Sequence, residues 1–222
     1  MKEVVVPSYK EGLNELRGSL ADMLPGDAME IFDADAVALQ KEHTSVLKLH
    51  KGDKAIDFTL SNAVSKGINL HEILKKDRVV LTFYRGAWCP YCNLALNQYQ
   101  AILPEITEAG ATLIAISPQS PDGSLNMQER NGLQFEVLSD NGNLIAKEYT
   151  TVHPNPKNSL EAMTEMGYDY DSYNADEDSE LPVPATFIIE RDSTISFARS
   201  EGADYRNRVE PREIIKALNT NK

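Results

Sequence analysis

Near-continuous apolar runs occur at intervals in the middle of the chain. Their β-branched and aromatic residues are typical of strands buried on both faces of a sheet. The segment after the first run carries apolar residues at helical spacing, and Pro104 is expected to kink or end that helix. The runs are Val79–Tyr84, Ala111–Ile116 and Phe135–Leu138, and helices are expected over Cys92–Glu108, Ser124–Asn131 and Leu144–Tyr149. This alternation predicts an α/β fold with a mainly parallel sheet covered by helices.

The first 48 residues follow a different, purely helical pattern. One apolar face is predicted from Leu13, Leu16, Leu20 and Met23, and Pro25-Gly26-Asp27 breaks it. A second helix follows, with candidate core positions at Met29, Phe32, Val37 and Leu39. We therefore expect an N-terminal helical arm over 1–48, acting as a scaffold or subunit contact, and a second domain over 49–222.

The alternation of strands and helices is interrupted after residue 149. A short helix over Ser159–Met166, with Ser159 as its N-cap, is predicted before an acidic and aromatic stretch at 168–180. That stretch is interpreted as a solvated face, with the alternative that its tyrosines cover a functional site. Strand character returns at Leu181–Glu190, and Ser196–Arg199 is expected to pair with it before a closing helix over Arg212–Leu218.

The two cysteines of the chain, Cys89 and Cys92, stand in a CxxC spacing just after the first apolar run. A helix begins at this point, and its N-terminal partial positive charge stabilises a thiolate. A strand that ends in CxxC at a helix start predicts a thiol–disulfide redox site. Two inert buried thiols are the structural alternative. A zinc site would need further ligands, and the four histidines lie singly in the sequence.

Charge and hydropathy exclude several classes of partner. The formal net charge is −12, which argues against nucleic acid or an anionic membrane surface. No window approaches the roughly 18 apolar residues of a membrane span. The N-terminus has three consecutive apolar residues before Pro7, too few for a secretory signal, so a cytoplasmic location is expected.

Several blocks resemble the peroxiredoxin-like branch of the alkyl hydroperoxide reductase and thiol-specific antioxidant (AhpC/TSA) family, in a CxxC form. The similarity runs in order from about Gly52 to Leu218. Its blocks are GDKAIDF at 52–58, FYRGAWCPYCN at 83–93, ATLIAISPQSPD at 111–122, FEVLSDNGNLIAKEY at 135–149, LPVPATFIIERD at 181–192 and DYRNRVEP at 204–211. The resemblance implies a thioredoxin-like fold and an antioxidant peroxidase that reduces hydroperoxides through a Cys89–Cys92 disulfide.

The resemblance also implies partners and site residues. A thioredoxin- or glutaredoxin-like dithiol donor would reset the disulfide, no metal or organic cofactor would be needed, and a homodimer is compatible with the sequence. Arg85 is a candidate to orient a peroxide or lower a thiolate pKa, or else forms a structural salt bridge. Trp88 is expected to cover the site at the surface. The Val183–Pro184 bond is expected to be cis and to pack beside the cysteines.

Two questions stay open at this point. Family spacing places Cys92 at the peroxide-attacking position, whereas thioredoxin logic makes Cys89 the attacker. The alternative functions are a thiol–disulfide oxidoreductase without peroxidase activity and a non-catalytic redox sensor.

Overall fold

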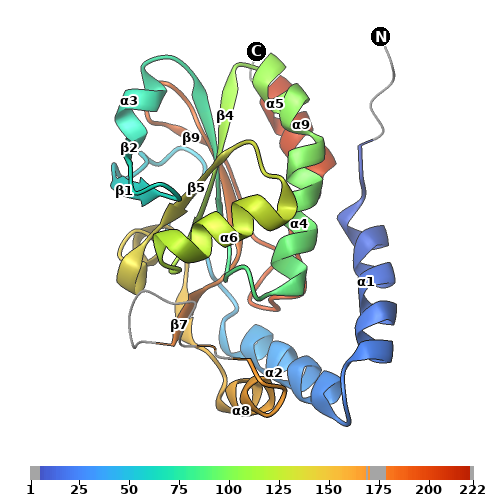
Figure 1. The fold of residues 1–222 in the computed structure, drawn as a ribbon. Coiled ribbons are helices and arrows are strands. Elements are labelled where there is room, and N and C mark those ends of the chain that lie inside the picture. Colours follow the sequence, from blue (N-terminus) through green and yellow to red (C-terminus); the bar gives the residue numbers. More distant parts are fainter. Residues whose placement is uncertain (1–5, 169, 171–178, 221–222) are drawn as a thin grey trace.

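The computed structural model describes residues 6–168, 170 and 179–220, and its centre is a seven-stranded sheet in the order β2-β1-β5-β4-β3-β8-β9 (Figure 1). In the described part these strands are β1 (Thr59–Asn62), β2 (Gly67–Asn69), β3 (Arg78–Phe83), β4 (Ala111–Ser117), β5 (Glu136–Ser139), β8 (Ala185–Ile189) and β9 (Ile195–Arg199). A separate pair is formed by β6 (Val152–Pro154) and β7 (Glu180–Pro182). The helices are α1 (Tyr9–Met23), α2 (Ala28–Glu42), α3 (Leu70–Leu74), α4 (Pro90–Ala101), α5 (Leu103–Glu108), α6 (Pro121–Asn131), α7 (Ala146–Tyr149), α8 (Lys157–Glu165) and α9 (Pro211–Thr220).

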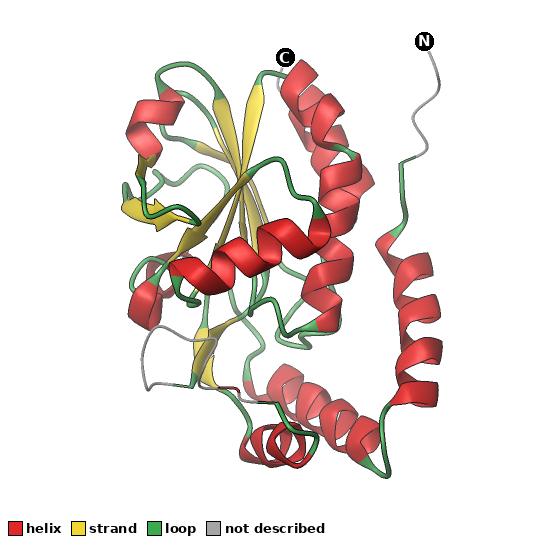
Figure 2. Cartoon of the chain, viewed as in Figure 1, coloured by secondary structure: helices red, strands yellow, loops and turns green. Residues whose placement is uncertain are grey.

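The sheet is mixed, with its parallel part at the centre. β3 pairs parallel with β4, and β4 with β5, while β8 runs antiparallel to both β3 and β9. Because side chains alternate along a strand, Val80 points to the core shared with α4, α5 and α9, and Val79 to a second core under α3 and α7. The α/β fold with a central sheet and flanking helices, expected from the apolar runs, is confirmed (Figure 2).

Most predicted elements are present, with two local corrections. The long helix breaks at Ile102, because Pro104 falls in the first turn of α5. Ser159 is not an N-cap, since α8 begins at Lys157 after Pro156. The backbone N–H and hydroxyl of Ser159 instead donate to the carboxylate of Asp35, at 3.1 and 2.7 Å.

Both arm helices pack on the rest of the chain. α1 lies along α4, and α2 lies against α8 at the end of the molecule where α4 begins (Figure 1). Asp33 of α2 accepts a bidentate hydrogen bond from Arg17 and a third from Arg206, all at 2.7 Å. The hydrogen bond from Arg206 therefore connects the arm to the closing loop at 202–210. The hydrogen bonds from Ser159 to Asp35 connect the arm to α8.

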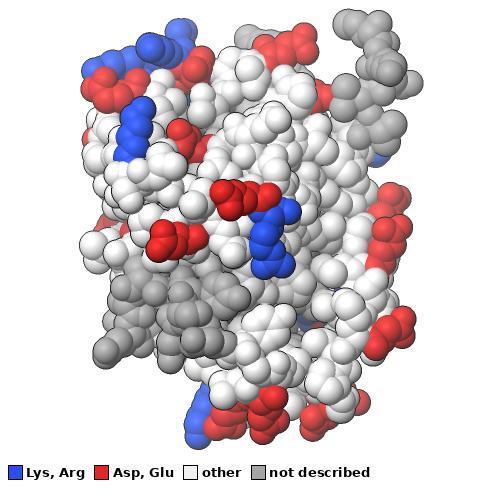
Figure 3. Space-filling model, in the orientation of Figure 1, with Lys and Arg blue, Asp and Glu red and all other residues white. Residues whose placement is uncertain are grey.

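The charged side chains are unevenly spread over the face seen in Figure 3. Basic and acidic groups lie together at the end where α3 lies, a further small group of both signs lies near the centre of the face, and acidic groups line one flank. Within the described residues, no helix is both long and apolar enough to cross a bilayer.

Candidate active site

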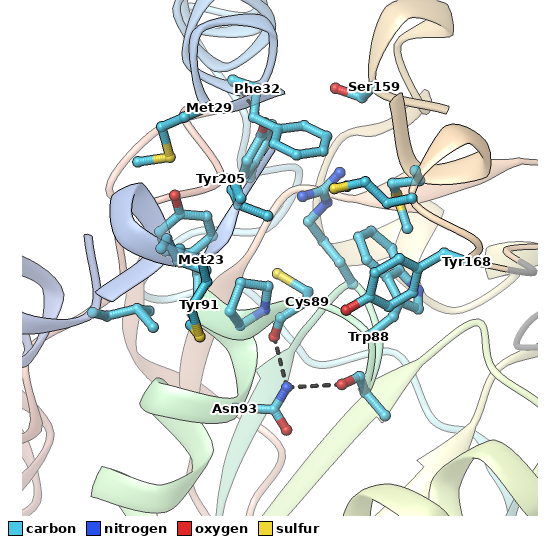
Figure 4. A pocket seen from close by; sticks show the side chains of 18 of the residues that line it. Met23, Met29, Phe32, Trp88, Cys89, Tyr91, Asn93, Ser159, Tyr168 and Tyr205 are labelled. Carbon is cyan, nitrogen blue, oxygen red and sulfur yellow. Dashed lines mark hydrogen bonds between the residues drawn. The ribbon is translucent and has the colours of Figure 1, made fainter. Parts of the chain in front are cut away.

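The CxxC turn connects the buried strand β3 to α4. Cys89 is the N-cap residue and Pro90 opens the helix, where its missing N–H is not needed. The amide of Asn93 donates to the backbone carbonyls of Ala87 and Cys89, at 2.7 and 2.9 Å, and so fixes the turn (Figure 4). The predicted strand, CxxC and helix order is present, with Cys89 at the positive end of α4.

Gly86 allows this turn to fold tightly. A Cβ placed there would lie 2.5 Å from Nε1 of Trp88, a separation that real structures do not reach. The amide oxygen of Gln119, from the loop after β4, accepts a hydrogen bond from the backbone N–H of Ala87 at 2.7 Å. The turn is therefore held from both the neighbouring loop and the first turn of α4.

Cys92 is fully buried beside a cation that the sequence did not single out. Nη2 of Arg208 donates to Sγ of Cys92 at 3.0 Å, and Arg208 is itself 7% exposed. Burial alone would raise the pKa of the Cys92 thiol, but the hydrogen bond from Cys89 and the charge of Arg208 hold that pKa well below its usual range. A backbone hydrogen bond from Arg85 acts in the same direction. The surroundings of Cys92 thus favour the ionised form of its sulfur.

Cys89 has the opposite character. Burial raises the pKa of its thiol, and the hydrogen bond it gives to Cys92 raises that pKa further. In Figure 4 its sulfur is directed into a cavity, between Tyr91 on one side and Trp88 on the other. The surroundings of Cys89 thus favour its neutral thiol, which faces the cavity, and neither cysteine forms a disulfide.

Arg85, which also lines the cavity, is held by aromatic rings. Its guanidinium carbon is 3.9 Å from the ring centroid of Tyr205 and 4.8 Å from that of Trp88, and Nη2 donates to Asn155 at 3.0 Å. No carboxylate forms a salt bridge with Arg85 among the described residues. The positive charge of Arg85 is therefore left to act on the two thiols. It favours the ionised form of both, although for Cys89 burial outweighs it and the pKa stays raised.

Trp88 lies at the site, whereas Pro184 differs from its expected geometry. Trp88 is half-buried and lines the cavity, and Tyr170 packs against its ring edge-on at 5.2 Å. The Val183–Pro184 bond was expected to be cis, and this is wrong, since no described peptide bond is cis. The trans form is the default for an X–Pro bond. Here the Val183 N–H donates to Thr151, and the Pro184 carbonyl accepts from Ser200.

The cavity in front of Cys89 has a volume of about 300 Å³ and is mainly apolar. Four of the six methionines of the chain line it, two from the arm and two from α8 and its C-cap. The lining also includes apolar residues of the arm and residues of the CxxC turn, together with Arg85, Arg130, Ser159, Tyr168 and Tyr205 (Figure 4). Tyr168 and Tyr170 thus support a covering role for the tyrosines of the acidic stretch, while Asp169 and 171–178 lie outside the described residues.

The sequence reasoning missed Arg208 and the contribution of the arm. Arg208 lies in the DYRNRVEP block, so the resemblance marked its segment but not its role. The arm was assigned a scaffold or contact role, yet Met29 and Phe32 form part of the cavity wall. The regular 3.6-residue spacing indicated an apolar helix face. Such a face can either pack in a protein core or line a cavity, and the spacing does not distinguish the two. No group of three or more potential metal-ligating side chains occurs in the part of the chain described.

Curated relatives match this chain over its central part. Peroxiredoxin Q from the chloroplast of Populus jackii is 30% identical over 108 residues, which are 49% of this chain and 50% of the relative. The thiol-disulfide oxidoreductase ResA of Halalkalibacterium halodurans is 29% identical over 92 residues, 41% of this chain and 51% of the relative. The chain thus spans about half the length of each of these two curated relatives.

Solved structures share the fold. Peroxidoxin BcpB from Mycobacterium tuberculosis superimposes with a TM-score of 0.62 at 19% identity, covering 78% of this chain and 99% of that one. The bacterioferritin comigratory protein of Xanthomonas campestris gives 0.57 at 16% identity, covering 74% and 91%. The thioredoxin-like fold expected from the resemblance is confirmed. The AhpC/TSA family model matches residues 51–198, about two thirds of the sequence, and the chain therefore belongs to the AhpC/TSA family.

Proposed function

We propose that this protein is a thiol peroxidase that reduces hydroperoxides through a cycle between Cys92 and Cys89. The observation that carries the proposal is the 3.0 Å contact between Nη2 of Arg208 and Sγ of Cys92. A buried cation supplies the charge that a thiolate needs, and the thiolate is the nucleophile that attacks a peroxide. The peroxiredoxin relatives support the same reaction class.

The proposed cycle assigns one chemical step to each sulfur. Sγ of Cys92 attacks one oxygen of ROOH, the O–O bond breaks, and ROH leaves after taking up a proton. The resulting Cys92 sulfenic acid condenses with the Cys89 thiol, which gives a disulfide and releases water. The CxxC form of the family is part of this proposal, as is the role of Arg85 as a second positive charge at the reacting sulfur.

An external dithiol must then return the disulfide to two thiols. A thioredoxin- or glutaredoxin-like protein is the donor class that the sequence led us to expect, and exchange proceeds through a mixed disulfide. The division into an arm over 1–48 and a redox domain over 49–222 also remains a proposal. In this proposal the arm contributes to the active site, because residues of the arm line the cavity in front of Cys89.

A second candidate is a thiol–disulfide oxidoreductase without peroxidase activity. The observation in its favour is that the thiol facing the cavity is Cys89, the first cysteine of the CxxC, as thioredoxin logic requires. The raised pKa of Cys89 argues against it, because a neutral thiol is a poor attacking group.

Stopped-flow fluorescence separates the two candidates. Trp88 is the single tryptophan and directly precedes Cys89, so its emission should change when the disulfide forms. Hydrogen peroxide should oxidise the reduced protein far faster than it oxidises a free thiol, and mass spectrometry should show the loss of two hydrogens. Oxidation at the rate of a free thiol, together with rapid reduction of glutathione disulfide, would overturn the peroxidase proposal in favour of the second candidate.

A further inference from the structure

The cavity in front of Cys89 contains positive charge that its own lining does not balance. Arg85 and Arg130 both line it, and no aspartate or glutamate of the described chain does. Neither arginine forms a salt bridge with a described carboxylate. In a chain with 34 acidic and 22 basic side chains, a cavity whose described charged residues are all arginines is suited to attract an anion.

Arg85 is the buried member of this pair, and it keeps unused hydrogen-bond donors. It is 3% exposed, and its Nη2 donates to Asn155 at 3.0 Å. Nε of Arg85 is buried and donates to no described acceptor, and the same is true of Nε1 of Trp88, which also lines the cavity. A buried donor without an acceptor costs free energy, and a buried cation without a counter-ion costs more. An acceptor that carries a negative charge would remove both costs at Arg85.

The aromatic contacts of Arg85 leave the edge of its guanidinium for such a ligand. The rings of Tyr205 and Trp88 lie over the guanidinium, at 3.9 and 4.8 Å from its carbon to their centroids. These contacts hold the group in place without neutralising its charge. Arg208 differs, because it donates a hydrogen bond to Sγ of Cys92. Arg85 is therefore the buried cation near the turn that remains available to a ligand.

The rest of the lining is largely apolar and comes mainly from the arm and α8. Leu16 and Leu20 of α1, Met29 and Phe32 of α2 and Met163 of α8 contribute to it. In Figure 4, Met29 and Phe32 lie across the space from the CxxC turn. The volume of about 300 Å³ is at the lower end of the range for ligand pockets. The cavity thus combines one buried cation with apolar walls for a small molecule.

We propose that this cavity binds a small monocarboxylate with an apolar chain, with the carboxylate at Arg85 and the chain against the arm. A planar guanidinium matches the geometry of a carboxylate. An inorganic anion would leave the apolar walls uncovered, and an alcohol would leave the charge of Arg85 unpaired. The proposed ligand is bound and not consumed, so this site goes beyond the proposed peroxidase reaction.

Binding of the carboxylate should be coupled to the ionisation of Cys92. The charge of Arg85 favours the ionised forms of both cysteines, so a bound carboxylate and the Cys92 thiolate compete for the same positive charge. The ligand should therefore bind more weakly when the thiolate is present, and by linkage it should disfavour the thiolate by the same factor. This coupling rests on the Cys92 thiolate of the proposed function, whereas the binding site itself does not.

The test measures calorimetric binding of four probes to the reduced protein: hexanoate, hexanol, hexylammonium and acetate. Hexanoate should bind about tenfold more tightly than hexanol or acetate, because it alone combines the charge with the chain. Hexylammonium should not bind. Arg85→Met should lower the affinity for hexanoate to that for hexanol. Arg191→Gln is the matched control, because Arg191 is exposed and outside the lining, and it should leave the ratio unchanged.

A spectroscopic measurement on the native protein makes the test independent of how the Arg85 variant folds. The proton–nitrogen correlation signal of the Arg85 Nε–H group should shift when hexanoate is added and stay in place with hexanol. Equal affinities for hexanoate and hexanol, an affinity for acetate equal to that for hexanoate, or an unmoved Nε–H signal would overturn the carboxylate site.

The coupling has its own test in Cys92→Ser, which removes the thiolate and keeps Cys89. At neutral pH this variant should bind hexanoate about fivefold more tightly than the reduced native protein does. Equal affinities would overturn the coupling. Failure of peroxide to oxidise the native protein would instead overturn the proposed function, and it would leave the binding result unaffected.

Discussion

The two cysteines of one CxxC turn lie in contrasting surroundings. Cys92 is fully buried beside the cation of Arg208 from the closing loop, and the backbone of Arg85 donates a hydrogen bond to it. Cys89 faces an apolar chamber made largely by the arm and α8. The motif supplies two identical side chains, and the segments packed around it give them different chemistry. The helix dipole acts on both, so it does not explain the difference.

Exchange of either cysteine for serine should change the reaction with peroxide more than any other substitution. It tests directly whether the two sulfurs have different roles. Cys92→Ser should abolish the reaction with peroxide, because the serine hydroxyl is not ionised at neutral pH. Cys89→Ser should still react once and stop at the sulfenic acid, since its resolving thiol is gone. Stopped-flow kinetics and trapping of the sulfenic acid with dimedone measure the two outcomes. The reverse pattern would exchange the roles assigned to the two sulfurs.

Removal of the Arg208 charge should have the next largest effect. Arg208→Met takes away the cation at 3.0 Å from Cys92, and an opposite charge at this range lowers a pKa by about 1–3 units. Oxidation by peroxide at pH 7 should therefore slow by about ten- to a hundredfold and recover as the pH rises through the new pKa of Cys92.

Two observations control for a purely structural effect of that change. Arg208→Lys keeps the charge and should restore part of the rate at pH 7. The rate of the native protein should fall less between pH 8 and pH 7 than the rate of Arg208→Met, because the pKa of Cys92 is lowered in the native protein. A rate of Arg208→Met that is equally low at all pH values would point to a collapsed site instead.

Gly86→Ala should weaken the turn that both cysteines share. The new Cβ would meet Nε1 of Trp88 at 2.5 Å, so the indole or the turn must shift, at a cost of up to about 3 kcal/mol in unfolding free energy. Gly18→Ala is the matched control, because nothing lies within 4 Å of its Cβ position in α1. Urea unfolding measures both changes, and a neutral Gly86→Ala would mean that the indole moves freely.

Mild acid should give the smallest effect, through His153. Burial lowers the pKa of His153 to about 4 from 6.5, so between these values the unfolded chain binds more protons and stability falls as the pH drops. From pH 7 to 5 the loss attributable to His153 should be about 2 kcal/mol. In His153→Gln this part of the pH dependence should disappear from urea unfolding curves. An unchanged pH profile in that variant would assign the acid sensitivity to carboxylates.

The strand, turn and helix start around the two cysteines could be predicted from the sequence. The contacts that distant segments make with the cysteines could not. The apolar run before Cys89 and the proline after it define a strand, a turn and a helix start within a few residues. Arg208 reaches Cys92 across 116 positions, and only closure of the whole fold brings them together. Val37 shows the same limit in another way, since its helical spacing suggested a core position but it is 42% exposed. Spacing gives a face of a helix, and packing decides which part of that face is covered.

The ties between the arm and the closing loop have a consequence for how this protein should be compared with its relatives. Arg208 and the arm both lie outside residues 51–198, the segment that the family model matches. The flanks set the ionisation of one sulfur and the access to the other, and the bonds of Asp33 join the two flanks to each other. The arm and the closing loop are therefore joined directly to each other. Homologues sorted by their flanks should fall into groups by donor and reactivity, and moving both flanks together onto another member's sheet should carry those properties with them.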